Sequence, residues 1–199
     1  TILFAAMFLY SAMQLYGIWQ EYREGETLYH NAQEEFLQQT EEPNTPQLAD
    51  ARLQFAVDFE SLQAVNTDVI GWIYIEDTVV NYPVLHSKKN NDEYLYTTYD
   101  GKQNNSGSIF ADYRNNIKSF DKNTILYAHG RYDMTMFGSL KDALKSGWVN
   151  DSTNHMVRLS TEYENTMWQV FSVYHIPTTT DYLRISFNDK AEYGAFLNT

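Results

Sequence analysis

The residue of this sequence that is best placed for chemistry is His129. It follows the apolar, β-prone run 124–127 after a single alanine, and Gly130 comes directly after it. Such a run predicts a strand, so His129 would stand at the end of a rigid element with its ring able to reach solvent. Histidine side chains change protonation near neutral pH, which suits a general acid or base, or the partner of a nucleophile. A lone histidine is also commonly structural, and this local pattern leaves both interpretations open.

Other catalytic motifs do not occur in the sequence. There is no Gly-x-Ser-x-Gly elbow, no Gly-rich phosphate loop and no His-Glu-x-x-His motif. His129 and Asp133 are four residues apart, but Gly130 would break a helix between them, and a metal needs more ligands than this pair. We therefore expect neither a metal nor a cofactor. The other histidines, which we expect to be structural or solvated, are His30, His86, His155 and His175.

The charge balance and the cysteine count exclude several kinds of site. The 14 basic and 26 acidic residues give a net charge of −12, which argues against a nucleic-acid surface, because such surfaces cluster Lys and Arg. The 199 residues contain no cysteine, so they hold no disulfide, no Cys-ligated metal and no thiol nucleophile.

The elements that must position His129 are short strands separated by turns. Strands are predicted at 69–75, 78–82, 108–111, 124–127, 155–159 and 167–176, with Pro83 ending the second of them and the last two forming a hairpin. Helices are predicted at 47–65, at 134–145 directly after His129, and at 189–197. This arrangement favours a mixed, mostly β barrel with helices over an alternating βαβ sheet.

The N-terminal segment 1–19 carries no charge and is long enough to cross a hydrocarbon core of about 30 Å. Trp19 and Tyr22 lie where an aromatic belt would. A buried amphipathic helix and a cleaved signal peptide are the alternatives, but the apolar residues surround the helix and no small-x-small cleavage site follows. Residues 20–46 then indicate a polar helical stalk, ending in a linker that contains Pro43 and Pro46.

Four ordered motifs carry a family resemblance. They are DVIGWIYIEDTVVNYPVL at 68–85, GSIFADYRN at 107–115, NTILYAHGRYDMTMFGSL at 123–140 and TTTDYLRISF at 178–187. In sequence and spacing the chain resembles the class B sortases, which are membrane-anchored cysteine transpeptidases of Gram-positive bacteria.

The resemblance implies an α+β fold, a sortase-type closed β-barrel with N-terminal helices. It divides the chain into a transmembrane signal anchor at 1–19, a stalk and linker at 20–46 and a catalytic domain at 47–199. It implies a single-pass membrane protein with the domain outside the cell. The partners would be exported proteins with a C-terminal sorting signal, cleaved after Thr, and an acceptor amine from a peptidoglycan precursor or a pilin.

The resemblance also implies a Cys-His-Arg site, of which only the histidine corresponds to a residue here, His129. In the family the Cys and Arg follow the helix that matches 189–197. Four arginines precede the position expected for the Cys, and none of them corresponds to the catalytic one: Arg114, Arg131, Arg158 and Arg184. We therefore interpret the chain as lacking the last barrel strands and expect it to be inactive as written. The alternative is a catalytically dead, membrane-anchored binding module.

The same resemblance suggests a substrate groove. Its implied lining residues are Leu95, Tyr127, Tyr182 and Leu183, together with one of two adjacent residues, Asn90 or Asn91, that the alignment of the loop does not separate. The alternative interpretation is that these aromatic and aliphatic side chains belong to the barrel core.

Overall fold

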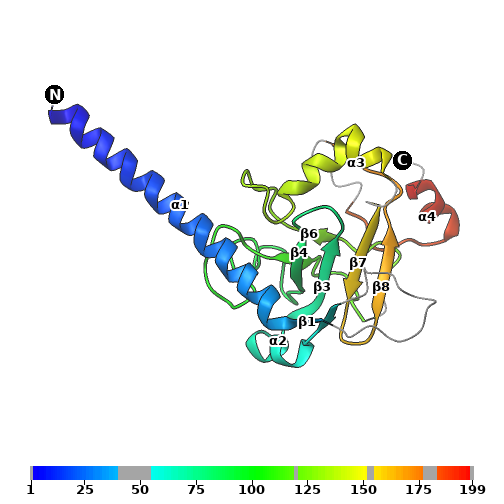
Figure 1. Cartoon of the computed structure of the whole chain (residues 1–199). Helices are drawn as coiled ribbons and strands as arrows, with labels where there is room; N and C mark the ends of the chain where they lie inside the picture. Colours follow the sequence, from blue (N-terminus) through cyan, green and yellow to red (C-terminus); the bar gives the residue numbers. More distant parts are fainter. Residues whose placement is uncertain (1, 40–54, 119–120, 152–154, 177–182, 198–199) are drawn as a thin grey trace.

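The computed structural model describes residues 2–39, 55–118, 121–151, 155–176 and 183–197 (Figure 1). A long helix, α1 (Ile2–Phe36), leads into a domain built around one curled β-sheet. The smaller elements around the sheet are the strands β1 (Leu37–Gln39) and β2 (Phe55–Val57), the helices α2 (Phe59–Val65), α3 (Ser146–Asn150) and α4 (Lys190–Leu197), and the 3-10 helix η2 (Gly138–Leu144).

The sheet has six strands in the order β6-β5-β4-β3-β7-β8. Only β4 and β5 run parallel, and the other neighbours are antiparallel. In the part of the chain that the structure describes, β6 and β8 form the two edges of a sheet curled into a half-barrel, which agrees with the expected α+β fold. The strands are β3 (Val69–Ile75), β4 (Asn81–Leu85), β5 (Ile109–Ala111), β6 (Leu126–Tyr127), β7 (Met156–Ser160) and β8 (Asn165–Gln169).

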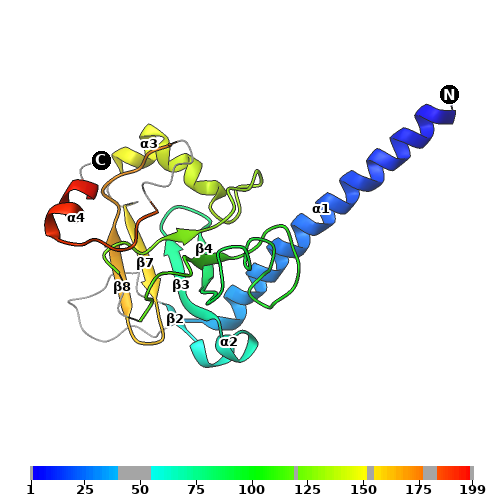
Figure 2. The ribbon, with the colours of Figure 1, turned by 180° about the vertical axis from the view of Figure 1, so that it is seen from behind.

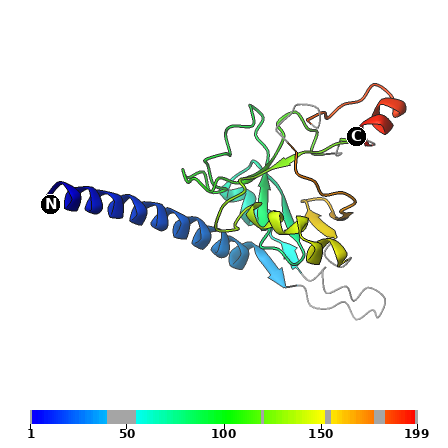
Figure 3. The same ribbon diagram turned by 90° about the horizontal axis from the view of Figure 1, so that it is seen from above.

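The first half of α1 projects from the domain and its second half packs against it (Figures 1, 2 and 3). Gly25, Tyr29, Ala32 and Phe36 recur at helical spacing and are buried, so this stripe belongs to the core. The Tyr29 hydroxyl donates to the Gly107 carbonyl oxygen across 2.5 Å. The segment expected to be a stalk therefore lies along the domain from Gly25 to Phe36. The predicted domain boundary at 46/47 lies outside the described residues.

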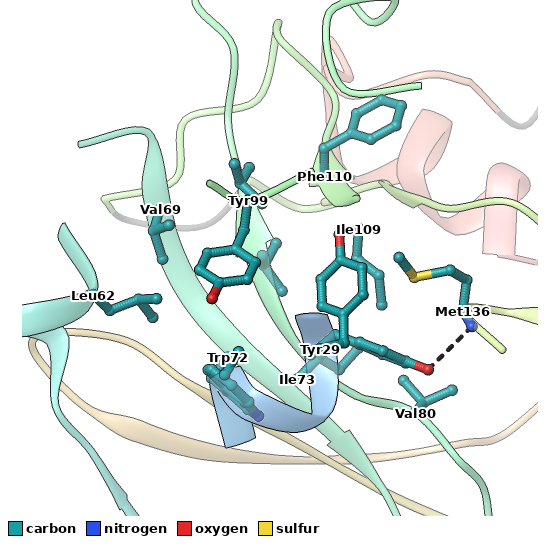
Figure 4. Close-up of a cluster of buried hydrophobic side chains, with 14 of the residues drawn as sticks. Tyr29, Leu62, Val69, Trp72, Ile73, Val80, Tyr99, Ile109, Phe110 and Met136 are labelled. Atoms are coloured by element: carbon teal, nitrogen blue, oxygen red, sulfur yellow. Dashed lines mark hydrogen bonds between the residues drawn. The ribbon is translucent and has the colours of Figure 1, made fainter. Parts of the chain in front are cut away.

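The core joins α1 to the central strands. β3 is buried at five of its seven positions, which agrees with the nearly continuous apolar run that predicted it. Figure 4 shows Tyr29 of α1 among Trp72, Ile73 and Met136. These residues come from distant parts of the chain, so the core fixes α1, the sheet and the segment after His129 relative to one another.

The helix predicted at 134–145 is wrong in its first turn. Met134 and Met136 have φ angles of 68° and 52°, a left-handed backbone that no α-helix contains. Met136 is 1% exposed, and its amide donates to the Tyr82 hydroxyl (Figure 4). Tertiary contacts of Met136 thus overrule the local helical spacing. Helical backbone begins only at Gly138, as η2, and continues in α3.

Two further elements differ from the sequence prediction. β4 starts at Asn81 and runs through Pro83, whereas the sequence suggested that Pro83 ends the strand. The neighbouring strand β5 pairs only with Val84 and Leu85, so the missing N–H of Pro83 removes no bond on that side. In the predicted helix 47–65, only Phe59–Val65 is helical. Phe55–Val57 is a strand paired with β1, and residues 47–54 lie outside the described part.

The remaining strands and the terminal helix agree with the sequence prediction. β7 and β8 form the expected hairpin, although β8 ends at Gln169 instead of residue 176. α4 covers Lys190–Leu197, close to the predicted 189–197.

Candidate active site

His129 lies two residues beyond the end of β6, and its ring is half-buried. Its Nε2 atom is 2.7 Å from the Leu95 carbonyl oxygen, and its ring centroid is 5.5 Å from that of Tyr96. A carbonyl oxygen only accepts hydrogen bonds, so Nε2 carries a proton while this bond is made. In the neutral ring Nδ1 is then the nitrogen left free to accept a proton. The carbonyl thus orients the ring for proton transfer at Nδ1.

The backbone around His129 is fixed on both sides. Its carbonyl oxygen accepts from the Phe137 amide across 3.0 Å, and Gly130 forms a β-bridge with Met136. The left-handed backbone at Met134 and Met136 turns the chain back to make these contacts. The segment that was expected to be a helix is therefore a tight return loop, which holds His129 in place.

The Leu95 carbonyl is positioned in turn by Gly107. The Ser108 amide donates to the Tyr94 carbonyl oxygen across 3.0 Å, which brings the two segments together. Gly107 has a φ of +58°, and a Cβ atom there would overlap the Leu95 carbonyl oxygen. Only glycine meets both conditions, the positive φ and the close approach.

Asp112, directly after β5, is a buried centre of hydrogen bonding that contacts some of the residues predicted to line a substrate groove. Its carboxylate accepts from Arg114 Nε and a terminal Arg114 nitrogen, both at 2.8 Å. It also accepts from the Tyr127 hydroxyl at 2.8 Å and from Asn91 Nδ2 at 3.0 Å. Burial opposes ionisation, but the bonds from Arg114, Tyr127 and Asn91 outweigh it and hold the pKa of the Asp112 carboxyl well below its usual range.

Arg114 extends this network to the C-terminal part of the described chain. Its side chain is 39% exposed, and a terminal nitrogen donates to the Leu183 carbonyl oxygen across 3.0 Å. The hydrogen bonds to Asp112 raise the pKa of Arg114, so the guanidinium remains charged. Arg114 thus binds the Asp112 carboxylate through Nε and Nη2. The same Nη2 also anchors the segment that carries Leu183.

The structure places the described site residues that the sequence predicted in two contact groups. Leu95 contacts His129 through its carbonyl, and Tyr127 and Leu183 are joined through Asp112 and Arg114. All three side chains are half-buried. Tyr182 lies outside the described residues. No contact tests the roles of these residues in binding, so they stay predictions.

The structure also separates the two asparagines. Asn91 reaches Asp112 and accepts from the Tyr113 amide at 2.9 Å, whereas Asn90 caps the amides of Asp92 and Glu93 in its own loop. Asn91, and not Asn90, is therefore the one bonded to Asp112. Asp112 and Arg114 were missed as site residues, although a carboxylate directly after an apolar strand, with an Arg two residues on, is visible in GSIFADYRN.

No protein-family model matches the chain. It is 39% identical over 140 residues to sortase B of Staphylococcus aureus and 37% identical over 141 residues to sortase B of Listeria monocytogenes. Each alignment covers 70% of this chain and 56% of the relative. Sortase B of Bacillus anthracis superposes with a TM-score of 0.74 at 35% identity, which covers 90% of this chain and 79% of that one.

The chain belongs to the class B sortase family. It spans little more than half the length of the curated sortases B that it matches. Among the described residues of this sortase, one helix, Ile2–Phe36, is long and apolar enough to cross a membrane by length and composition. No group of three or more His, Asp or Glu in the described ranges gathers as a metal site.

Proposed function

We propose that this chain supplies the histidine half of a sortase active site, with His129 as the general acid and base. The observation that carries the proposal is the single orientation of the ring. The Leu95 carbonyl oxygen accepts from Nε2, which leaves Nδ1 as the ring nitrogen that can take up a proton. The backbone around His129 is also held on both sides, by the bond from the Phe137 amide and the bridge from Gly130 to Met136, which supports a fixed ring.

The proposed reaction is transpeptidation in two steps. A cysteine thiolate attacks the carbonyl carbon of a Thr in the sorting signal, the peptide C–N bond breaks, and the leaving amine takes a proton from His129. An acceptor amine then attacks the thioester, gives a proton to His129 and releases the thiolate. The 199 residues contain no cysteine, so we assign them no turnover of their own. In this proposal the thiol and the oxyanion-stabilising Arg come from other residues of the enzyme.

Two structures of Staphylococcus aureus sortase B support the substrate classes. One is described as a substrate complex and another as a complex with triglycine, and both are 38% identical to this chain with a TM-score of 0.66. We propose that a C-terminal sorting signal binds along Leu95, Tyr127, Tyr182 and Leu183. The acceptor would be a peptidoglycan-precursor or pilin amine.

We also propose that residues 1–19 anchor the protein in the membrane as a single span, with the domain outside the cell. The helix is fully exposed over its apolar part, which leaves a continuous apolar surface for lipid. Carbonate-washed membranes are expected to retain the protein, and its release in that wash would contradict the anchor.

The absence of cysteine from these residues favours a second candidate, a sortase-like binding module without catalysis. Sequencing the locus beyond codon 199 and assaying the whole gene product separates the two. The enzyme proposal expects a Thr-Cys or Ser-Cys strand, then an Arg-bearing strand, and cleavage of a sorting-signal peptide that is lost in His129→Ala. A gene product that binds the peptide, lacks a thiol and cleaves nothing would contradict the enzyme proposal and support the binding module.

A further inference from the structure

The domain of this protein begins within one helical turn of the apolar span. The backbone N–H of Asn105 donates to Glu21 Oε1 across 2.7 Å, and the guanidinium of Arg131 lies 3.9 Å from the ring centre of Tyr22. At a rise of about 1.5 Å per residue, Tyr22 is only about 5 Å beyond Trp19 along the helix. The helix continues unbroken into the core, so no flexible stalk separates the domain from the span, and the side chains of the domain decide which of its faces meets the bilayer.

Three cation–aromatic pairs of the described residues lie at this end of the domain. Arg23 lies over the Trp19 ring at 5.2 Å, Arg131 over Tyr22 at 3.9 Å, and Lys141 over Tyr132 at 5.2 Å. We call these six residues the basic-aromatic stripe. Figure 1 shows the loop after β6, which carries Arg131, reaching back toward the projecting half of α1. The stripe thus includes residues at the end of the apolar span and residues of the domain, and the contact of Tyr22 with Arg131 joins the two.

Tyr132 is almost fully exposed, at 93%, more than any other large apolar or aromatic side chain in the described part of the domain. Its neighbour Lys141 is held beside it, because Lys141 Nζ donates to the carbonyl oxygens of Gly130 and Arg131 at 3.3 and 3.2 Å. An exposed Tyr ring beside a fixed ammonium is the pairing found at membrane interfaces, where rings enter the headgroup layer and cations meet phosphates.

The charges near the stripe leave its outer cations available. Glu21 accepts from Asn105, Glu24 accepts from Gln20 at 3.1 Å, and Asp133 is held by Arg131 and Thr135. Glu26 lies a further turn away from the apolar span. Within the described ranges, neither Arg23 nor Lys141 has a carboxylate within ion-pair distance. In a protein of net charge −12, these are unpaired cations at the end nearest the span.

The stripe also borders a cleft of about 630 Å³ between α1 and the domain. Tyr22, Arg23, Glu26, Arg131 and Thr135 are among its lining residues. This cleft gives a phosphate-bearing headgroup room beside Arg23, while the Arg131 side chain is only 6% exposed and is paired with Asp133.

We propose that the basic-aromatic stripe lies on the bilayer and binds the headgroups of anionic phospholipids. The inference rests on the proposed membrane anchor and adds to it a second contact, made by the domain itself. Because His129 is two residues from Arg131, this contact would hold the active-site edge at a set height above the membrane.

The test uses the 199-residue chain in bilayers and the fact that it contains no cysteine, so that one introduced thiol takes a spin label uniquely. Tyr132→Cys places the label on the stripe. Tyr163→Cys, 75% exposed in the β7–β8 turn, is the matched control. Relaxation of each label by a paramagnetic metal held on lipid headgroups is measured in phosphatidylcholine alone and in its mixture with phosphatidylglycerol.

We expect strong relaxation at position 132 in the mixed bilayer, several-fold weaker relaxation in phosphatidylcholine alone, and none at 163 in either. Arg23→Gln combined with Lys141→Gln should reduce the signal at 132 to the control level. Lys122→Gln, an exposed lysine beside Tyr193, should leave it unchanged. Circular dichroism confirms that each variant is folded.

Anchored, folded protein whose label at 132 relaxes no more than the label at 163 would overturn the stripe while leaving the anchor intact. Equal relaxation at 132 in both bilayers would overturn the requirement for anionic lipid. Release of the whole protein by carbonate would overturn the anchor, and the stripe with it.

Discussion

A side chain on Gly107 would collide with Leu95, because its Cβ atom would overlap the Leu95 carbonyl oxygen. That oxygen is the one that accepts from His129 Nε2. A backbone contact between two loops therefore sets the orientation of the candidate catalytic ring.

Gly107→Ala is expected to destabilise the chain and to disturb His129. The positive φ and the steric contact both oppose it, so we expect a loss of more than about 2 kcal/mol of unfolding free energy. Gly101→Ala is the control, because Gly101 also has a positive φ (+80°) but nothing lies within 4 Å of its Cβ position. That variant should lose only about 1 kcal/mol. Urea unfolding measures both, and equal losses would contradict the role of the Leu95 contact.

Asp112→Asn is expected to loosen the groove network. The substitution removes the charge that Arg114 pairs with. Because Arg114 is 39% exposed, we expect the unfolding free energy to fall by about 3 kcal/mol, the lower end of the range for breaking a buried pair. Asp92→Asn, at an exposed position, should change stability by less than about 0.5 kcal/mol. A loss at Asp112 no larger than the one at Asp92 would show that the network carries no stability.

The lowered pKa of the Asp112 carboxyl predicts that the unfolding free energy depends on pH in the acid range. Its pKa is lower in the folded chain than the value of about 3.9 in an unfolded one, so its contribution is present above that pH and is lost as the pH falls below it. The difference in unfolding free energy between wild type and Asp112→Asn should therefore be largest above about pH 5 and should shrink below about pH 4. A difference that does not change over this range would contradict the assignment.

Tyr29→Phe tests the attachment of α1 to the domain. The variant keeps the ring but loses the hydrogen bonds to the Gly107 carbonyl and the Ser108 hydroxyl, so we expect a loss of about 1–2 kcal/mol. Tyr163→Phe, at an exposed position, should be neutral. Burial raises the pKa of Tyr29 above its usual value, so its stabilising effect is complete below about pH 10 and is lost as the pH rises further. The gap between wild type and variant should narrow in alkali, as followed by unfolding at increasing pH.

His129→Ala should separate chemistry from folding. In the thiol-bearing enzyme we expect a fall in turnover of at least about 100-fold, the usual contribution of a general acid or base. The variant loses one hydrogen bond, to Leu95, so the unfolding free energy should fall by only about 1 kcal/mol. His175→Ala, at an exposed position, is the control for both measurements. Turnover near the wild-type level in His129→Ala would remove His129 from the mechanism.

Patterns within short stretches of sequence were enough to predict several elements. The apolar run of β3, the β7–β8 hairpin, the C-terminal helix and the charge-free span all depend on neighbouring residues, and so does the position of His129 after a strand. The motif order identified the family for the same reason, because each motif is a local run of residues.

Contacts between distant residues were decided only by the tertiary structure. Asp112 meets Tyr127 and Asn91, which are 15 and 21 residues away, and no periodicity encodes such a meeting. The core position of Met136 replaced a helix by a left-handed turn, and the burial of Tyr29 turned an expected stalk into part of the domain. Local propensity is worth only a fraction of a kcal/mol per residue, roughly 0–0.7, whereas burying a large side chain is worth about 1.5–3 kcal/mol, so packing prevails where the two conflict.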